Sequence, residues 1–150
     1  MKYQLAQINI AKLLKPINHP QIADFVNQLD EINALAEKSE GFVWRLKDDN
    51  SNDATGLSPF LNPNIIVNMS VWENAEVLKN YVYNSDHSKV FLRRKEWFEK
   101  PTKSHMALWW IEEGKFPTVQ QAKEKLEYLQ KNGNSEVAFT FRDIKNPPKN

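Results

Sequence analysis

The stretch Asn64-Ile65-Ile66-Val67-Asn68-Met69-Ser70-Val71-Trp72 indicates a β-strand more clearly than any other part of the chain. Every second residue from Ile65 to Val71 is apolar, whereas the residues between them include Asn68 and Ser70. A period of two is typical of a strand whose two faces meet different surroundings. We therefore predict a strand with one apolar face and one mixed face.

The same alternation predicts further strands at residues 3–13, 42–47 and 105–111. Residues 137–141 are interpreted as an additional edge strand. The residues from about 143 to 150, which contain Pro147 and Pro148, are expected to fray.

Helices are predicted where apolar residues recur three or four positions apart. The first runs from Pro20 to Gly41, and the next two begin at the capping residues Asn74 and Ser85. A last helix begins at Thr118, which forms a capping box with Gln121, and ends at Gly133. The order strand, helix, strand, strand, helices, strand predicts one α+β domain over residues 1–150. We expect a ferredoxin-like βαββαβ layout with an extra C-terminal helix.

Composition excludes several kinds of protein. The 150 residues contain no cysteine, so disulfides and thiolate chemistry are ruled out. A net charge of +1 gives no electrostatic footprint for nucleic acid. There is no apolar run long enough to span a membrane and no signal-peptide pattern, so we expect a cytoplasmic protein. The four glycines form no phosphate-binding loop, and we expect no nucleotide or other cofactor.

The two faces of the predicted sheet differ in polarity. We expect the helices to cover the uniformly apolar face, made of Ala6, Ile8, Ile10, Phe42, Trp44, Leu46, Ile65, Val67, Met69 and Val71. The mixed face would carry Tyr3, Leu5, Gln7, Asn9, Val43, Arg45, Ile66, Asn68, Ser70 and Trp72, with either Trp109 and Ile111 or Leu108 and Trp110.

The mixed face is too apolar for water and too polar for a dry core. A homodimer that encloses a small-molecule cavity would satisfy both properties. The alternative is that the polar residues hydrogen-bond one another in a filled interior.

Candidate site residues follow from this face. Arg45 would hold an acidic or phenolate group, and Asn9 would hold a carbonyl or an oxygen species. His87 begins a predicted helix, where a neutral imidazole would act as a base, although an exposed histidine near a cap explains the same pattern. The other candidate substrate-binding residues are Gln7, Asn68, Ser70, Trp72, Arg94 and Trp109. His19, His87 and His105 have no metal-binding spacing, and the acidic residues Asp48, Asp49 and Asp53 are typical of a solvated loop, so no metal is expected.

Five stretches in order resemble a bacterial family known as domain of unknown function 3291. They are Leu5–Ala11, Gly41–Leu46, Val67–Glu73, Arg94–Phe98 and Leu108–Trp110. The resemblance implies a dimeric α+β barrel of the kind found in antibiotic-biosynthesis monooxygenases, and it implies no activity.

A second resemblance, to those monooxygenases and to haem-degrading enzymes, is carried by Trp72-Glu73 followed by Ser85-Asp86-His87, together with Asn9. The tryptophan and histidine that haem degraders use are not matched here, which argues against haem chemistry. Three hypotheses therefore stand. The chain is a cofactor-independent oxygenase- or isomerase-like enzyme acting on an aromatic or polyketide-like molecule, a dimeric carrier or sensor of such a molecule, or a structural dimer.

Overall fold

The computed structural model describes residues 2–47, 64–84, 93–101 and 103–148. Its centre is an antiparallel sheet of four strands in the order β2-β3-β1-β4. The strands are β1 (Tyr3–Lys12), β2 (Phe42–Arg45), β3 (Ile65–Trp72) and β4 (Met106–Glu112). This order is that of the ferredoxin-like βαββαβ fold, which confirms the predicted fold class.

The helices expected after Pro20, Asn74 and Thr118 are present, and only the end of the helix expected from Ser85 falls within the described residues. A short 3₁₀ turn, η1 (Pro20–Ile22), leads into α1 (Ala23–Lys38), and α2 (Ala75–Asn84) follows β3. The side chain of Asn74 accepts a hydrogen bond from the backbone N–H of Val77 at 3.0 Å, as expected for a cap. The helix α4 (Arg94–Trp97) precedes β4, and α5 (Val119–Asn132) begins with the expected capping box.

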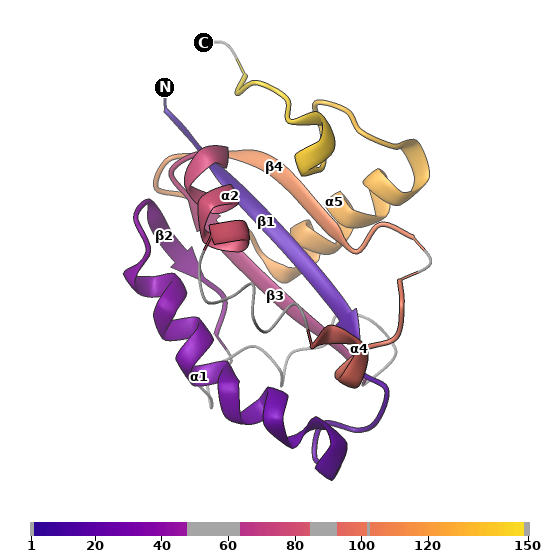
Figure 1. Cartoon of the computed structure of the whole chain (residues 1–150). Helices are drawn as coiled ribbons and strands as arrows, with labels where there is room; N and C mark the ends of the chain where they lie inside the picture. Colours follow the sequence, from indigo (N-terminus) through magenta and orange to yellow (C-terminus); the bar gives the residue numbers. More distant parts are fainter. Residues whose placement is uncertain (1, 48–63, 85–92, 102, 149–150) are drawn as a thin grey trace.

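The helices α1 and α2 lie on one side of the sheet and α5 lies on the other (Figure 1). Both β1-α1-β2 and β3-α2-β4 connect parallel strands that are separated by one strand. Such crossovers are right-handed, which places their two helices on the same face. The remaining helix, α5, then covers the other face.

The prediction of which face the first helices cover was wrong. Ala36 of α1 and Leu78 of α2 pack with Leu5 and Trp72, which belong to the mixed face. The apolar face packs against α5, with Leu126 beside Ile8. Alternation shows that a strand has two faces, but it does not show which of them a given helix will take.

The expected position of Phe42 was also wrong. The pairing of β2 with β3 shifts between Phe42 and Trp44, so that Phe42 lies opposite Trp72 and Trp44 lies opposite Val71. This bulge turns Phe42 to the mixed face, where its ring meets Trp72 edge-on at 5.5 Å between centroids. Val43 and Trp44 consequently both pack toward the α5 side.

The C-terminal part of the chain covers the outer edge of β4. Leu108 and Phe139 exchange two backbone hydrogen bonds of 2.8 and 2.9 Å, and the indole of Trp110 donates to the carbonyl of Lys145 at 2.8 Å. The predicted strand at 137–141 is therefore a single bridge, followed by the short 3₁₀ turn η2 (Phe141–Asp143).

Candidate functional site

A row of three polar side chains crosses the sheet beneath α1. Arg45 of β2 is the register partner of Ser70 in β3, and Ser70 is the partner of Gln7 in β1. Their side chains therefore lie on the same face, with neighbouring Cβ atoms about 4.5–5.5 Å apart. All three residues are at most 7% exposed. We call Arg45, Ser70 and Gln7 the polar row.

Apolar clusters bound the polar row at both ends of the strands. At one end, Leu5, Trp72 and Leu78 pack together with Ala36 of α1. At the other end, Leu13, Ile22, Phe25 and Trp97 form a separate cluster that Ile66 joins. Burying polar groups in such surroundings is unfavourable unless they find partners.

Hydrogen bonds link the polar row to its neighbours. The Nε2 of Gln7 donates to the Oγ of Ser70 at 2.8 Å and to the Oδ1 of Asn68 at 2.7 Å. The indole N–H of Trp72 also donates to the Oγ of Ser70, at 2.8 Å. These bonds use neither the Oε1 of Gln7 nor the hydroxyl proton of Ser70. The network thus retains an acceptor and a donor beyond its internal bonds.

Arg45 ends the row and is joined to α1. Its Nε donates to Oε1 of Glu37 at 2.8 Å, and Nζ of Lys47 lies 3.6 Å from the same oxygen. The hydrogen bond from Arg45 lowers the pKa of Glu37 below its ordinary value. One carboxylate between two cations leaves the group with a net positive charge.

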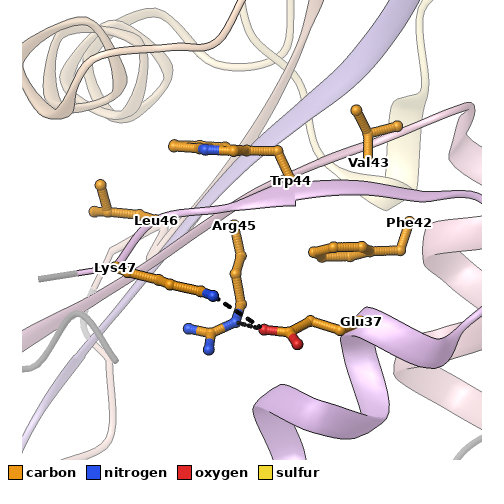
Figure 2. Close-up of a pocket in the computed structure, with 7 residues that line it drawn as sticks. All are labelled: Glu37, Phe42, Val43, Trp44, Arg45, Leu46 and Lys47. Atoms are coloured by element: carbon orange, nitrogen blue, oxygen red, sulfur yellow. Dashed lines mark hydrogen bonds and ion pairs between the residues drawn. The ribbon is translucent and has the colours of Figure 1, made fainter. Parts of the chain in front are cut away.

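The β2 edge beside this group is hollowed. A depression of about 510 Å³ is lined by Glu37 and by residues 42–47. Figure 2 shows Arg45, Lys47 and Phe42 projecting toward α1, whereas Val43, Trp44 and Leu46 project to the other side of the strand. The depression therefore gives access to the cationic end of the polar row.

Aromatic rings and a hydroxyl from α2 lie next to the row. Tyr81 stacks on Trp72 with centroids 5.0 Å apart, and its hydroxyl lies 3.4 Å from the carbonyl oxygen of Ile32 in α1. Burial raises the pKa of Tyr81 to about 12, against a smaller opposing effect of the nearby positive charge of Arg45. Tyr81 is thus protonated at neutral pH and acts as a hydrogen-bond donor.

The structure brings together four of the residues that the sequence singled out. Gln7, Arg45, Ser70 and Trp72 are buried around the polar row. Asn68 is exposed at the end of the hydrogen-bonded chain, and Asn9 is its register partner in the next row.

The other predicted residues lie elsewhere. The choice between the two faces of β4 is settled, because Leu108 is the register partner of Gln7 and shares its face. Trp109 therefore lies on the opposite face, in the cluster under α5. Arg94, a candidate for binding the substrate, is exposed on α4, whereas Trp97 of the same helix is buried. His87 and the acidic residues of 48–53 lie outside the described residues.

Three residues near the row were missed from the sequence: Glu37, Tyr81 and Asn33. In the sequence, Glu37 has the pattern of an ordinary charged helix residue, and Tyr81 falls on the apolar spacing of its helix. Asn33 is 8% exposed and lies within the apolar spacing of α1 that includes Leu29 and Ala36. A polar residue at such a position was the signal by which the sequence could have identified it.

A metal site finds no support within the described ranges, where no three His, Asp or Glu residues are grouped to hold an ion. In the same part of the chain, no helix is long and apolar enough to cross a membrane.

Comparison with known proteins identifies the family. The model of the family described as Domain of unknown function (DUF3291) matches residues 4–150. The chain belongs to this family. No curated protein matches this DUF3291 member.

Solved structures resemble this DUF3291 member at low sequence identity. A protein of unknown function from Nitrosomonas europaea is 14% identical, with a TM-score of 0.51 over 77% of this chain and 96% of that chain, which shows a shared fold. A conserved protein from Methanosarcina mazei is 17% identical, covering 71% of this chain and 90% of that one, with a TM-score of 0.49. SnoaB from Streptomyces nogalater, a cofactor-independent oxygenase, is 13% identical, covering 77% and 98%, with a TM-score of 0.47. These last two resemblances are too distant to support an inference about this chain.

Proposed function

We propose that this protein binds a small aromatic molecule bearing an acidic oxygen, at the β2 edge where the depression beside α1 reaches Arg45 of the polar row. The observation that carries the proposal is the burial of the polar row between two apolar clusters. Its hydrogen bonds leave Oε1 of Gln7 and the proton of Ser70 unused. A purely structural network would be expected to satisfy these groups internally.

The chemistry of the neighbouring residues supports this class of ligand. Arg45 supplies a guanidinium, which binds carboxylate and phenolate oxygens well. Phe42, Trp72 and Tyr81 supply aromatic surface beside it. An aromatic acid would place its charge at Arg45 and its ring near these side chains.

Calorimetric titration of the whole chain with 2-naphthoate tests this proposal, with 2-naphthamide as the neutral comparison. We expect 2-naphthoate to bind at least about tenfold more tightly, since one charge-assisted hydrogen bond contributes about 1.5–3 kcal/mol. Arg45→Met should remove the preference, and Arg45→Lys should retain part of it. Lys12→Met, at an exposed lysine that pairs with Glu99 at 3.3 Å, is the matched control and should change affinity about twofold or less. Equal affinity of the unaltered protein for both compounds, or no binding of either, would contradict the proposal.

A second candidate function is cofactor-independent oxygenase- or isomerase-like catalysis on such a molecule. It is favoured by the guanidinium of Arg45, whose positive charge would stabilise an enolate or phenolate as it forms. The Tyr81 hydroxyl, which donates to the carbonyl of Ile32 at 3.4 Å, would have to turn toward the ligand to add a second hydrogen bond. The proton would pass to His87 in the hypothesis drawn from the sequence. Electron-rich phenols incubated with the protein should then consume oxygen or exchange a carbon-bound proton, and His87→Gln should slow this at least about 100-fold. If the protein binds these phenols but neither consumes oxygen nor exchanges a carbon-bound proton, the result would favour a carrier or sensor.

We also propose a homodimer, as the sequence suggested, although not through the mixed face that α1 and α2 cover. The support is apolar surface at β2 on the α5 side, where Trp44 stacks on Phe116 at 5.3 Å and Phe116 is 50% exposed. Analytical ultracentrifugation should show a dimer that Phe116→Ser weakens, whereas Tyr83→Ser, at another exposed aromatic residue, should not. The cytoplasmic location stays a prediction, which cell fractionation checks.

A further inference from the structure

Asn33 is a buried polar residue in the stripe of α1 that faces the sheet. Leu29, one turn earlier, packs in the cluster around Trp97, and Ala36, one turn later, packs in the cluster around Trp72. Asn33 therefore lies over the region between the two clusters, which is where the polar row crosses the sheet. It is 8% exposed.

The carboxamide of Asn33 has no hydrogen-bond partner among the side chains and backbone groups of the described residues. Among the described residues, only the Oε1 of Gln4 is both fully enclosed and without a partner, so the polar atoms of Asn33 keep a small contact with solvent. Water, or a bound molecule that displaces it, must then supply the hydrogen bonds that the described residues do not.

The surroundings of Asn33 place it at the cationic end of the polar row. Glu37, which holds Arg45, lies one helical turn after Asn33 on the same face, with Cβ atoms about 5–6 Å apart. Ile32, whose carbonyl oxygen lies 3.4 Å from the Tyr81 hydroxyl, immediately precedes it in the chain. Asn33 therefore lies on α1 between the residue that contacts Tyr81 and the residue that contacts Arg45.

We propose that Asn33 is a specificity-determining residue of this site, and that it selects aromatic acids carrying a neutral hydroxyl or carbonyl group beside the acidic oxygen. This inference rests on the proposed function. Arg45 binds the ionised oxygen, and the Asn33 carboxamide, which can both donate and accept, pairs with the neutral group. The ligand class is thus an ortho-hydroxy or ortho-keto aromatic acid.

Calorimetric titrations with 3-hydroxy-2-naphthoate and 2-naphthoate test the inference, because the two probes differ by the neutral hydroxyl alone. The unaltered protein should prefer the hydroxylated acid about 3- to 10-fold, the contribution of one hydrogen bond. Asn33→Leu should bring this ratio to about one while 2-naphthoate still binds. Asn27→Leu, at an exposed asparagine of the same helix, is the matched control and should keep the ratio.

Thermal unfolding of the same variants gives an independent readout. Asn33→Leu should raise the melting temperature by about 2 °C or more, because it replaces an unpartnered buried amide with an apolar side chain. A lower melting temperature would mean that the amide is satisfied within the fold, and would overturn the inference.

The outcomes of the titrations separate the two proposals. Equal binding of both probes by the unaltered protein, abolished by Arg45→Met, would overturn the role of Asn33 and leave the proposed function in place. A preference for the hydroxylated acid that persists in Asn33→Leu would also overturn the role of Asn33 and leave the proposed function in place. Binding of neither probe would overturn the proposed function and this inference with it.

Discussion

Glu37 accepts a hydrogen bond of 2.8 Å from the Nε of Arg45, and this contact joins the last turn of α1 to the edge strand β2. The arginine side chain is 5% exposed, whereas that of Glu37 is 39% exposed. The pair thus holds a buried cation against the sheet from a carboxylate that water still reaches.

Replacing Glu37 by Gln should destabilise the protein by about 1 kcal/mol at pH 7, because the buried guanidinium loses its charged partner while water screens part of the effect. The folded-state pKa of Glu37 is lowered. Its contribution is therefore complete above the ordinary value of 4.5 and disappears as the pH falls through the lower folded value. Urea unfolding at pH 7 and pH 3 should show a difference between the variant and the unaltered protein at pH 7 that shrinks at pH 3. Glu31→Gln, on the same helix, is the control, and an equal loss there would contradict the prediction.

Ser70→Ala should cost about 1–3 kcal/mol, because it leaves the N–H groups of Trp72 and Gln7 without their shared acceptor in a buried place. Urea unfolding measures the loss, and the emission of Trp72 should shift as its indole N–H loses its partner. Ser104→Ala, at an exposed serine, should stay within about 0.5 kcal/mol of the unaltered protein. If Ser70→Ala leaves the free energy of unfolding unchanged, the hydrogen bonds to Ser70 do not stabilise the fold.

Gly41→Ala should destabilise the protein more than Gly114→Ala. Both glycines have positive φ, at 82° and 88°, so both substitutions carry backbone strain. A Cβ at Gly41 would also lie 2.5 Å from the side chain of Val77 in α2, whereas nothing lies within 4 Å at Gly114. The excess should be about 1–3 kcal/mol, and Val77→Ala in the Gly41→Ala background should recover part of it. Equal unfolding midpoints of the two alanine variants would refute this account.

Tyr81 should ionise later than an ordinary tyrosine. Its pKa is raised to about 12 by burial, so absorbance at 295 nm should show a late step that Tyr81→Phe removes and Tyr83→Phe, at a 58% exposed residue, does not. Since the unfolded chain releases this proton near pH 10, the folded state loses stability as the pH rises from about 10 to 12. A late step that persists in Tyr81→Phe would assign the buried phenol elsewhere.

The order of elements could be predicted because it depends on local periodicity. Alternation around Val67 and Met69 indicated β3, and the spacing from Phe25 to Ala36 indicated α1. The cap at Asn74 and the capping box at Thr118 are likewise local, since each depends on residues three positions away.

What could not be predicted depends on contacts between distant parts of the chain. The bulge between Phe42 and Trp44 appears only when β2 is aligned with β3, so strict alternation misplaced Phe42. The face taken by α1 depends on the handedness of two crossovers. Asn33 stands out along α1 only as a polar residue on the apolar stripe, and Tyr81 does not stand out along α2. The relation of both residues to Arg45 depends on how the two helices pack on the sheet.

The two edge strands of the sheet, β2 and β4, differ in how open they are to pairing with a strand of another chain. Phe139 already occupies the hydrogen-bonding groups of β4 at Leu108, while no described strand pairs with the outer edge of β2. Within the described part of the chain, the outer edge of β4 is thus paired at Leu108, whereas β2 carries an edge at which another chain could add a strand. Two copies joined through their β2 edges would each use this edge in the contact, so such an association would form a pair.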